Sequence, residues 1–119
     1  MNKITVYGIP NCDSVKKTLE WLKQGNIPYE FHNYKTHGIS ELKLKEWSKL
    51  AGWEKFFNKK SSTWRKLMSE AGNENLTSAK ALKLMMENTS IIKRPIIEFN
   101  GSILVGFDAS NFEIQFLKQ

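Results

Sequence analysis

Cys12 is the one cysteine of this sequence and the residue best suited to covalent chemistry. It follows a turn-forming segment, residues 8–11, and precedes apolar residues whose spacing predicts a helix over residues 13–24: Val15, Leu19 and Leu22. A thiol at a helix start faces unsatisfied amides and the positive end of the helix dipole, which favour the reactive thiolate. An isolated cysteine is also often a small buried apolar side chain. The position at a helix start favours the nucleophile.

The single cysteine also limits what the chain can do alone. No internal disulfide can form, so thiol chemistry at Cys12 needs a sulfur from a second molecule. A disulfide-stapled secreted fold is excluded, and the N-terminus has no long apolar segment typical of a signal peptide, so we expect a cytoplasmic protein. His32 and His37 stand five residues apart with no thiolate cluster beside them, so we expect no metal site.

The composition is that of an ordinary folded protein. The 119 residues are 40% hydrophobic and 25% charged, and we expect one domain over residues 1–119. The formal net charge of +6 favours contact with anions. No segment approaches the roughly 20 apolar residues of a membrane helix. No predicted helix has a dense basic face, so we expect no direct DNA binding.

Two cations, Lys93 and Arg94, precede Pro95 at the start of a β-favouring segment. A guanidinium can hold a carboxylate or an oxyanion through two parallel hydrogen bonds, so this pair could bind an anionic ligand. Two solvated charges at a strand entrance are an equally good interpretation. Pro95 also has a simple interpretation, because proline at the first residue of a strand disturbs the sheet little.

A polar segment over residues 58–65 (NKKSSTWR) combines three hydroxyls with three cations. It could bind an anionic group or cap a helix. We favour capping, with Arg65 contributing a charge to a ligand site. No glycine-rich phosphate loop of Walker or dinucleotide spacing is present.

The first half of the chain predicts the elements that position Cys12. Strands are predicted at residues 4–7 and 27–34, on either side of the helix at 13–24. A strand, helix and strand this compact imply parallel strands. Residues 40–90 predict helices and no strand, with Ser40 and Thr77 as N-terminal caps. The apolar residues expected to face the core there are Leu42, Trp47, Leu50, Ala79, Leu82, Met85 and Met86.

The end of the chain predicts a hairpin and a helix. Asn100 and Gly101 separate two β-favouring segments, which is a strong hairpin signal. Ser110 and Glu113 match a capping box that would open a final helix. The whole order predicts an α/β, thioredoxin-like fold: a mixed four-stranded sheet with an inserted helical subdomain over about residues 40–90. Another α+β fold could have the same element order. In a thioredoxin-like fold, a cis Pro95 would pack beside Cys12.

Three motifs, taken together, resemble the arsenate reductase (ArsC) and Spx-like family, and specifically its YffB branch. They are residues 7–17 (YGIPNCDSVKK), 58–67 (NKKSSTWRKL) and 92–97 (IKRPII). The resemblance covers the whole chain in order. It implies a glutathione-dependent thiol reductase with Cys12 as nucleophile, and no bound cofactor. The residues it implies for substrate or glutathione binding are Asn11, Lys93, Arg94, Pro95 and Arg65.

Four positions depart from better-known branches of this family. Gly8 stands where the arsenate reductases are expected to have a histidine, and Asn58 and Gly106 stand where two of their arginines would fall. Arsenate reduction is therefore disfavoured. Val15 stands where the Spx regulators have the second cysteine of a Cys-x-x-Cys switch, so an internal switch cannot form.

The sequence is consistent with two functions. In the favoured one, the Cys12 thiolate attacks an oxidised substrate or a mixed disulfide, and glutathione or a glutaredoxin-type partner releases the product. In the alternative, the chain is an Spx-like transcriptional regulator that binds RNA polymerase, with Cys12 vestigial.

Overall fold

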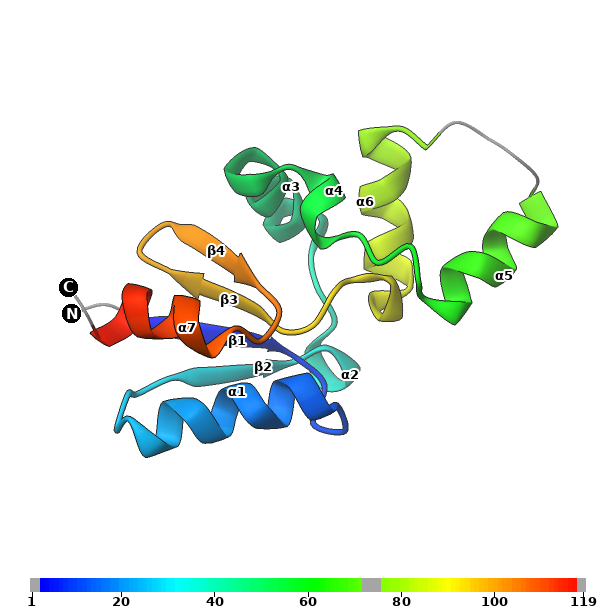
Figure 1. The fold of residues 1–119 in the computed structure, drawn as a ribbon. Helices are drawn as coiled ribbons and strands as arrows, with labels where there is room; N and C mark the ends of the chain where they lie inside the picture. The colour runs from blue at the N-terminus through cyan, green and yellow to red at the C-terminus, as the bar shows by residue number, and fades with distance from the viewer. Residues whose placement is uncertain (1–2, 72–75, 118–119) are drawn as a thin grey trace.

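A mixed four-stranded sheet forms the centre of the computed structural model, which describes residues 3–71 and 76–117 (Figure 1). Its strands are β1 (Ile4–Gly8), β2 (Glu30–Asn33), β3 (Ile96–Phe99) and β4 (Ser102–Val105). They lie in the order β2-β1-β3-β4. Strand β1 pairs in parallel with β2 and antiparallel with β3, and β3 and β4 form the predicted hairpin. The predicted thioredoxin-like fold is confirmed.

The helices follow the strands in two groups. Helix α1 (Asp13–Gln24) connects β1 to β2, with the bounds that the sequence predicts. The helices between β2 and β3 are α2 (Tyr34–His37), α3 (Glu41–Ala51), α4 (Trp53–Phe56), α5 (Ser62–Ala71), α6 (Ser78–Glu87) and the 3-10 turn η1 (Thr89–Ile91). After β4 come α7 (Ala109–Phe112) and a π-helical turn, η2 (Glu113–Leu117).

Alternation along the strands divides the core in two. Ile4 and Val6 of β1 pack with residues of α1 and α7, whereas Tyr7 packs with residues of α3, α4 and α6. Figure 1 shows the same division, with α3, α4 and α6 gathered away from α1 and α7. Successive side chains of a strand point to opposite faces, so both faces of the sheet are buried, each by a different set of helices.

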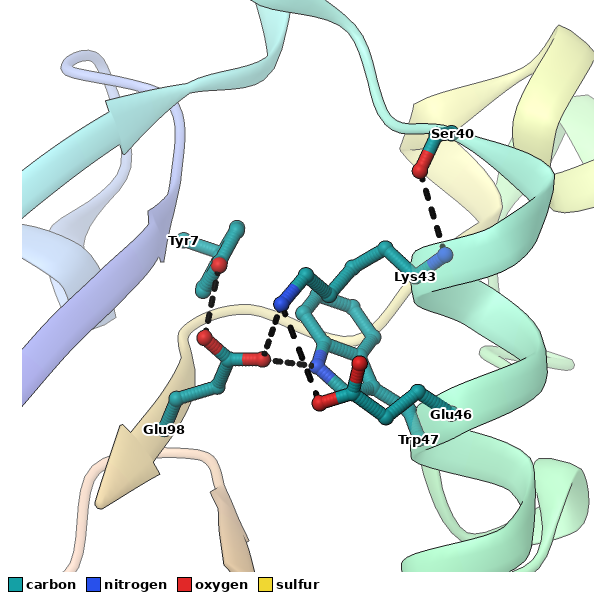
Figure 2. Close-up of polar contacts among 6 residues, drawn as sticks. All are labelled: Tyr7, Ser40, Lys43, Glu46, Trp47 and Glu98. Atoms are coloured by element: carbon teal, nitrogen blue, oxygen red, sulfur yellow. Dashed lines mark hydrogen bonds and ion pairs between the residues drawn. The ribbon is translucent and has the colours of Figure 1, made fainter. Parts of the chain in front are cut away.

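Glu98 of β3 joins the sheet to α3 (Figure 2). Its Oε1 accepts a hydrogen bond from the Tyr7 hydroxyl at 2.7 Å, and its Oε2 accepts from Trp47 Nε1 at 2.8 Å and Lys43 Nζ at 2.9 Å. Burial acts to raise the pKa of Glu98. The hydrogen bonds from Trp47, Lys43 and Tyr7, with the charge of Lys43, outweigh burial and leave that pKa below the ordinary glutamate value. The charged carboxylate therefore holds β1, β3 and α3 together.

Two of the three N-terminal caps predicted for helices are present in the structure, and the third is not. Ser40 accepts a hydrogen bond from the Lys43 amide, and Thr77 accepts one from the Lys80 amide, so both predicted caps are confirmed. The prediction that Ser110 caps the final helix is wrong. Asp108 is the cap, because its side chain accepts from the Asn111 amide and the helix begins one residue before Ser110.

Three other expectations need correction. The strand predicted at residues 27–34 is confined to Glu30–Asn33. Before it, the Ile27 amide donates to the Leu22 carbonyl of α1; after it, the Asn33 side chain accepts a hydrogen bond from the Lys35 amide and caps α2. On α3, the buried residues are Leu44 and Trp47, whereas Leu42 is 79% exposed and Leu50 is 45% exposed. On α6, Ala81 is buried with Leu82 and Met85, while Ala79 is exposed and Met86 is half-buried.

Candidate functional site

Cys12 is the N-cap residue of α1, directly after the loop that leaves β1. Its backbone is extended, at φ −148° and ψ 125°, and its carbonyl accepts the first helical hydrogen bond, from the Lys16 amide at 2.9 Å. The side chain is partly exposed and makes no capping hydrogen bond. The sulfur is therefore accessible and stands at the positive end of a helix of 12 residues.

The loop to Cys12 is held by close packing between Gly8 and Val15. A Cβ atom at position 8 would lie 2.7 Å from Cγ2 of Val15, which is too close for a side chain to fit there unmoved. Val15 itself is fully buried. Strand β1 and the first turn of α1 thus approach as closely as they do because residue 8 is glycine.

A cavity of about 670 Å³ opens beside Cys12. Its lining comes from the start of α1, from α4 and the segment after it, from the segment before β3, and from the end of β4. The lining residues are Cys12, Ser14, Lys55, Asn58, Lys93, Arg94, Val105 and Gly106. Three of them are cations and, among the described residues that line the cavity, none is acidic. A cleft lined by charges of one sign concentrates ligands of the opposite sign, so this cavity suits an anionic ligand.

Backbone pairing brings the distant parts of the cavity together. Phe57 and Ile92 form an isolated antiparallel bridge. Next to it, the Asn58 amide donates to the Ile91 carbonyl at 2.6 Å, and the Lys93 amide donates to the Phe56 carbonyl at 2.8 Å. The segment after α4 is thereby fixed against the segment before β3. Lys55 and Asn58 consequently line the same space as Lys93 and Arg94.

Pro95 follows two lining residues of the cavity, Lys93 and Arg94, but is not itself in the lining. The peptide bond between Arg94 and Pro95 is cis, as a thioredoxin-like fold predicts, and Pro95 is buried. Its carbonyl accepts a hydrogen bond from the Gly106 amide at 2.8 Å. That bond places the end of β4 beside the cations that precede β3.

Comparison with known proteins places these features in a family. The sequence profile of the ArsC family matches residues 7–114, which include every residue of the cavity. The chain belongs to the ArsC family.

Relatives of this ArsC-family chain include uncharacterised and regulatory proteins. An uncharacterised protein of Haemophilus influenzae is 42% identical over 113 residues, covering 95% of this chain and 98% of its own. A protein of Listeria monocytogenes named global transcriptional regulator Spx is 27% identical over 107 residues, covering 88% of this chain and 80% of its own. The solved structure of a protein named YFFB is 40% identical, with a TM-score of 0.87 and coverage of 93% and 96%. Together with Cys12, these relationships support a general thiol–disulfide oxidoreductase type.

The cavity contains three of the six residues that the sequence indicates for the site of this ArsC-family chain. Cys12, Lys93 and Arg94 line it. Asn11 is exposed in the preceding loop and Pro95 is buried, and neither is a lining residue. Arg65 is exposed in the first turn of α5 and is likewise not part of the lining. The binding roles of these residues stay predictions.

The polar segment at residues 58–65 is used largely for local structure. Ser61 Oγ accepts from the Trp64 amide at 3.4 Å and the Ser61 carbonyl accepts from the Arg65 amide at 3.0 Å, so Ser61 caps α5, as the capping interpretation predicts. Thr63 Oγ1 accepts a hydrogen bond from Ser90 at 2.9 Å. Asn58 is the residue of this segment that lines the cavity.

The cavity is also lined by Ser14, Lys55 and Val105, to which the sequence assigns no role in the site. Lys55 lies three residues before Asn58, so proximity to the second family motif was the available signal. Asn58 and Gly106 are positions at which the sequence departs from the arsenate reductases, and both line the cavity. The departures therefore change the surface that a substrate would meet.

No group of three or more histidine, cysteine, aspartate or glutamate residues is arranged to hold a metal ion within residues 3–71 and 76–117. In the same part of the chain, no helix has the length and apolar character needed to cross a membrane.

Proposed function

We propose that this ArsC-family chain is a thiol–disulfide oxidoreductase with Cys12 as its single nucleophile and glutathione as its co-substrate. One observation carries the proposal: Cys12 stands at the start of α1 and lines a cavity with Lys55, Lys93 and Arg94. Glutathione is an anionic tripeptide thiol, so its charge suits these cations.

The reaction proceeds in two exchanges. The Cys12 thiolate attacks one sulfur of a disulfide; the Cys12–sulfur bond forms, the old sulfur–sulfur bond breaks, and its electron pair leaves with the second sulfur as a thiolate. A glutathione thiolate then attacks the substrate sulfur of this mixed disulfide. Cys12 leaves as a thiolate, and glutathione departs as a new disulfide with the substrate fragment. A glutaredoxin-type thiol donor could replace glutathione in the second exchange.

Residues in and beside the cavity have different roles in this reaction. Lys93 and Arg94 bind carboxylates of glutathione, with Arg94 offering paired donors. The loop residue Asn11 precedes Cys12, where backbone amides can donate to the sulfur. A thiol reductase that draws on glutathione works in a reducing compartment, so we place it in the cytoplasm.

Arsenate is a disfavoured substrate on this proposal. Asn58 and Gly106 line the cavity where the family resemblance leads us to expect arginines, and Gly8 leaves no room for a histidine side chain against Val15. A disulfide, which needs no three-arginine cradle, suits this lining better.

Intact mass spectrometry after exposure to glutathione disulfide tests the proposal. Because Cys12 is the one cysteine, a single glutathione adduct identifies its own site. We expect the adduct to form and to disappear on addition of reduced glutathione, and Cys12→Ser to form none. A wild-type chain that stays unmodified under conditions that modify a small free thiol would contradict the proposal.

A second candidate function is an Spx-like regulator, favoured by the Spx relative that matches 88% of this chain. In that case the chain would bind RNA polymerase and Cys12 would be dispensable. Co-purification of wild type and Cys12→Ser with RNA polymerase, together with absence of thiol exchange, would favour the regulator. Thiol exchange without polymerase binding would favour the reductase.

A further inference from the structure

Lys55 contributes a third cation to the Cys12 cavity from a part of the chain distant in sequence from the other two. It belongs to α4, whose next residue, Phe56, is fully buried. The Phe56 carbonyl accepts the Lys93 amide at 2.8 Å, so the backbone beside Lys55 is fixed to the backbone of Lys93. The backbone from which the Lys55 side chain extends therefore has a set position relative to the cavity, and the residue is exposed.

The three cations of this cavity have no acidic partner among the residues that the structure describes, unlike the lysines of a second cavity. Within the described part of the chain, Lys55, Lys93 and Arg94 form no ion pair. In that second cavity, of about 510 Å³, both lining lysines are paired: Lys3 with Glu30 at 3.1 Å and Lys43 with Glu98 at 2.9 Å. Positive charge is thus left uncompensated in the cavity beside Cys12, whereas the lysines of the second cavity are paired.

We infer that Lys55 is a specificity-determining residue that selects disulfides whose non-reacting end carries a carboxylate. The inference rests on the proposed thiol exchange at Cys12 and adds the substrate class: small acidic disulfides, in preference to neutral or cationic ones. As the disulfide enters, its carboxylate binds the Lys55 ammonium, and Cys12 attacks the nearer sulfur. The departing thiolate takes the electron pair of the broken sulfur–sulfur bond, as in the exchange above.

Three small disulfides of different charge test this selectivity. They are 3,3′-dithiodipropionate, which is anionic, hydroxyethyl disulfide, which is neutral, and cystamine, which is cationic. The measurement is the rate at which Cys12 of the full chain forms each mixed disulfide, followed by mass spectrometry. Each rate is divided by that of a free thiol with the same disulfide, which removes differences in leaving group.

We expect the wild type to prefer the anionic disulfide, and Lys55→Ala to reduce that rate by about threefold to fivefold, the effect of a partly exposed ion pair. The neutral disulfide should react at an unchanged rate and the cationic one faster. Lys55→Glu should reverse the preference, and Lys55→Arg should retain it. Lys49→Ala, on α3 and outside the cavity, is the matched control and should change no rate.

The outcomes separate this inference from the function on which it rests. Equal effects of Lys55→Ala on all three disulfides, or none on any, would overturn the role of Lys55 while leaving exchange at Cys12 intact. A wild-type chain that reacts with no disulfide faster than the free thiol does would overturn the proposed function itself. Unchanged thermal unfolding of each variant excludes loss of folding as the cause, and Lys55→Arg keeps the test decisive if Lys55→Ala unfolds.

Discussion

The carboxylate of Glu98 on β3 accepts a hydrogen bond from the indole of Trp47 on α3 at 2.8 Å, which ties the inserted helices to the sheet. Trp47 is fully buried, so its N–H has no access to solvent as a substitute partner. The same carboxylate binds Lys43 and Tyr7 (Figure 2). The inserted helical part also carries Lys55 and Asn58, which line the Cys12 cavity. The bond between Glu98 and Trp47 therefore helps to position these two residues.

Glu98→Ala should lower the free energy of unfolding by about 2–3 kcal/mol, because it leaves the Trp47 donor buried and unpaired. Glu98→Gln keeps the shape of the side chain and one hydrogen-bond acceptor, so this variant should lower the free energy of unfolding by about 1 kcal/mol. Urea unfolding measures both. Glu41→Gln is the control, since its partner Lys45 and Glu41 itself are more than half exposed, and it should have little effect. Equal stability of Glu98→Ala and wild type would contradict this account of the insert.

The stability that Glu98 contributes should depend on pH. Its pKa is lower in the folded chain than the ordinary value of 4.5, so the native state favours the charged form. That contribution is complete above pH 4.5 and is lost as the pH falls through the folded pKa. The gap in stability between wild type and Glu98→Gln should therefore stay constant at neutral pH and narrow below pH 4.5. A gap that widens in acid would instead mean that folding raises the pKa of Glu98.

Tyr34 offers a substitution that should not destabilise the fold. Its side chain is 3% exposed, and its hydroxyl has no hydrogen-bond partner among the described residues. An unpaired buried hydroxyl is unfavourable, so Tyr34→Phe should raise the free energy of unfolding by about 1 kcal/mol. Tyr7→Phe is the contrast: it removes the donor to Glu98 and should lower stability by about 1 kcal/mol. Chemical unfolding of the two variants compares them; a loss of stability in Tyr34→Phe would show that the hydroxyl has a partner.

The contact between Gly8 and Val15 predicts a coupled pair of substitutions. Gly8→Ala should lower the free energy of unfolding by about 1–3 kcal/mol, because the new Cβ overlaps the Val15 side chain. Adding Val15→Ala makes room, so the two changes should be coupled by about 1 kcal/mol in a double-mutant cycle. Gly25→Ala is the control, since its Cβ would lie no closer than 3.3 Å to Ile27 and 3.6 Å to the Trp21 carbonyl oxygen. Strictly additive effects would argue against the close approach.

Features with local causes could be predicted from the sequence. Helix α1 has its predicted bounds because its start at the Cys12 turn and its apolar spacing are both local. The hairpin followed from Asn100 and Gly101, both of which adopt positive φ. Strand β2 ends at Asn33 because this residue caps a helix at Tyr34, a local bond that competes with β-favouring aromatic residues. It begins at Glu30 rather than at residue 27, and the Ile27 amide instead donates to the Leu22 carbonyl of α1.

Features that depend on packing between distant segments could not be predicted. Trp47 is buried as predicted, but α3 turns Leu44 to the core beside it and leaves Leu42 and Leu50 exposed. Lys55 reaches the Cys12 cavity through the pairing of Phe57 with Ile92, which are 35 residues apart, 92 − 57. No local pattern encodes that bridge. The sequence could place Lys93 and Arg94 at the site, because they directly precede Pro95.

The central claim is that Cys12 alone performs thiol exchange supported by glutathione. The most direct measurement is steady-state reduction of hydroxyethyl disulfide by glutathione, with wild type and Cys12→Ser compared at equal concentration. We predict turnover by wild type that rises with glutathione concentration, and the uncatalysed rate alone for Cys12→Ser. Equal rates for the two proteins would contradict the claim.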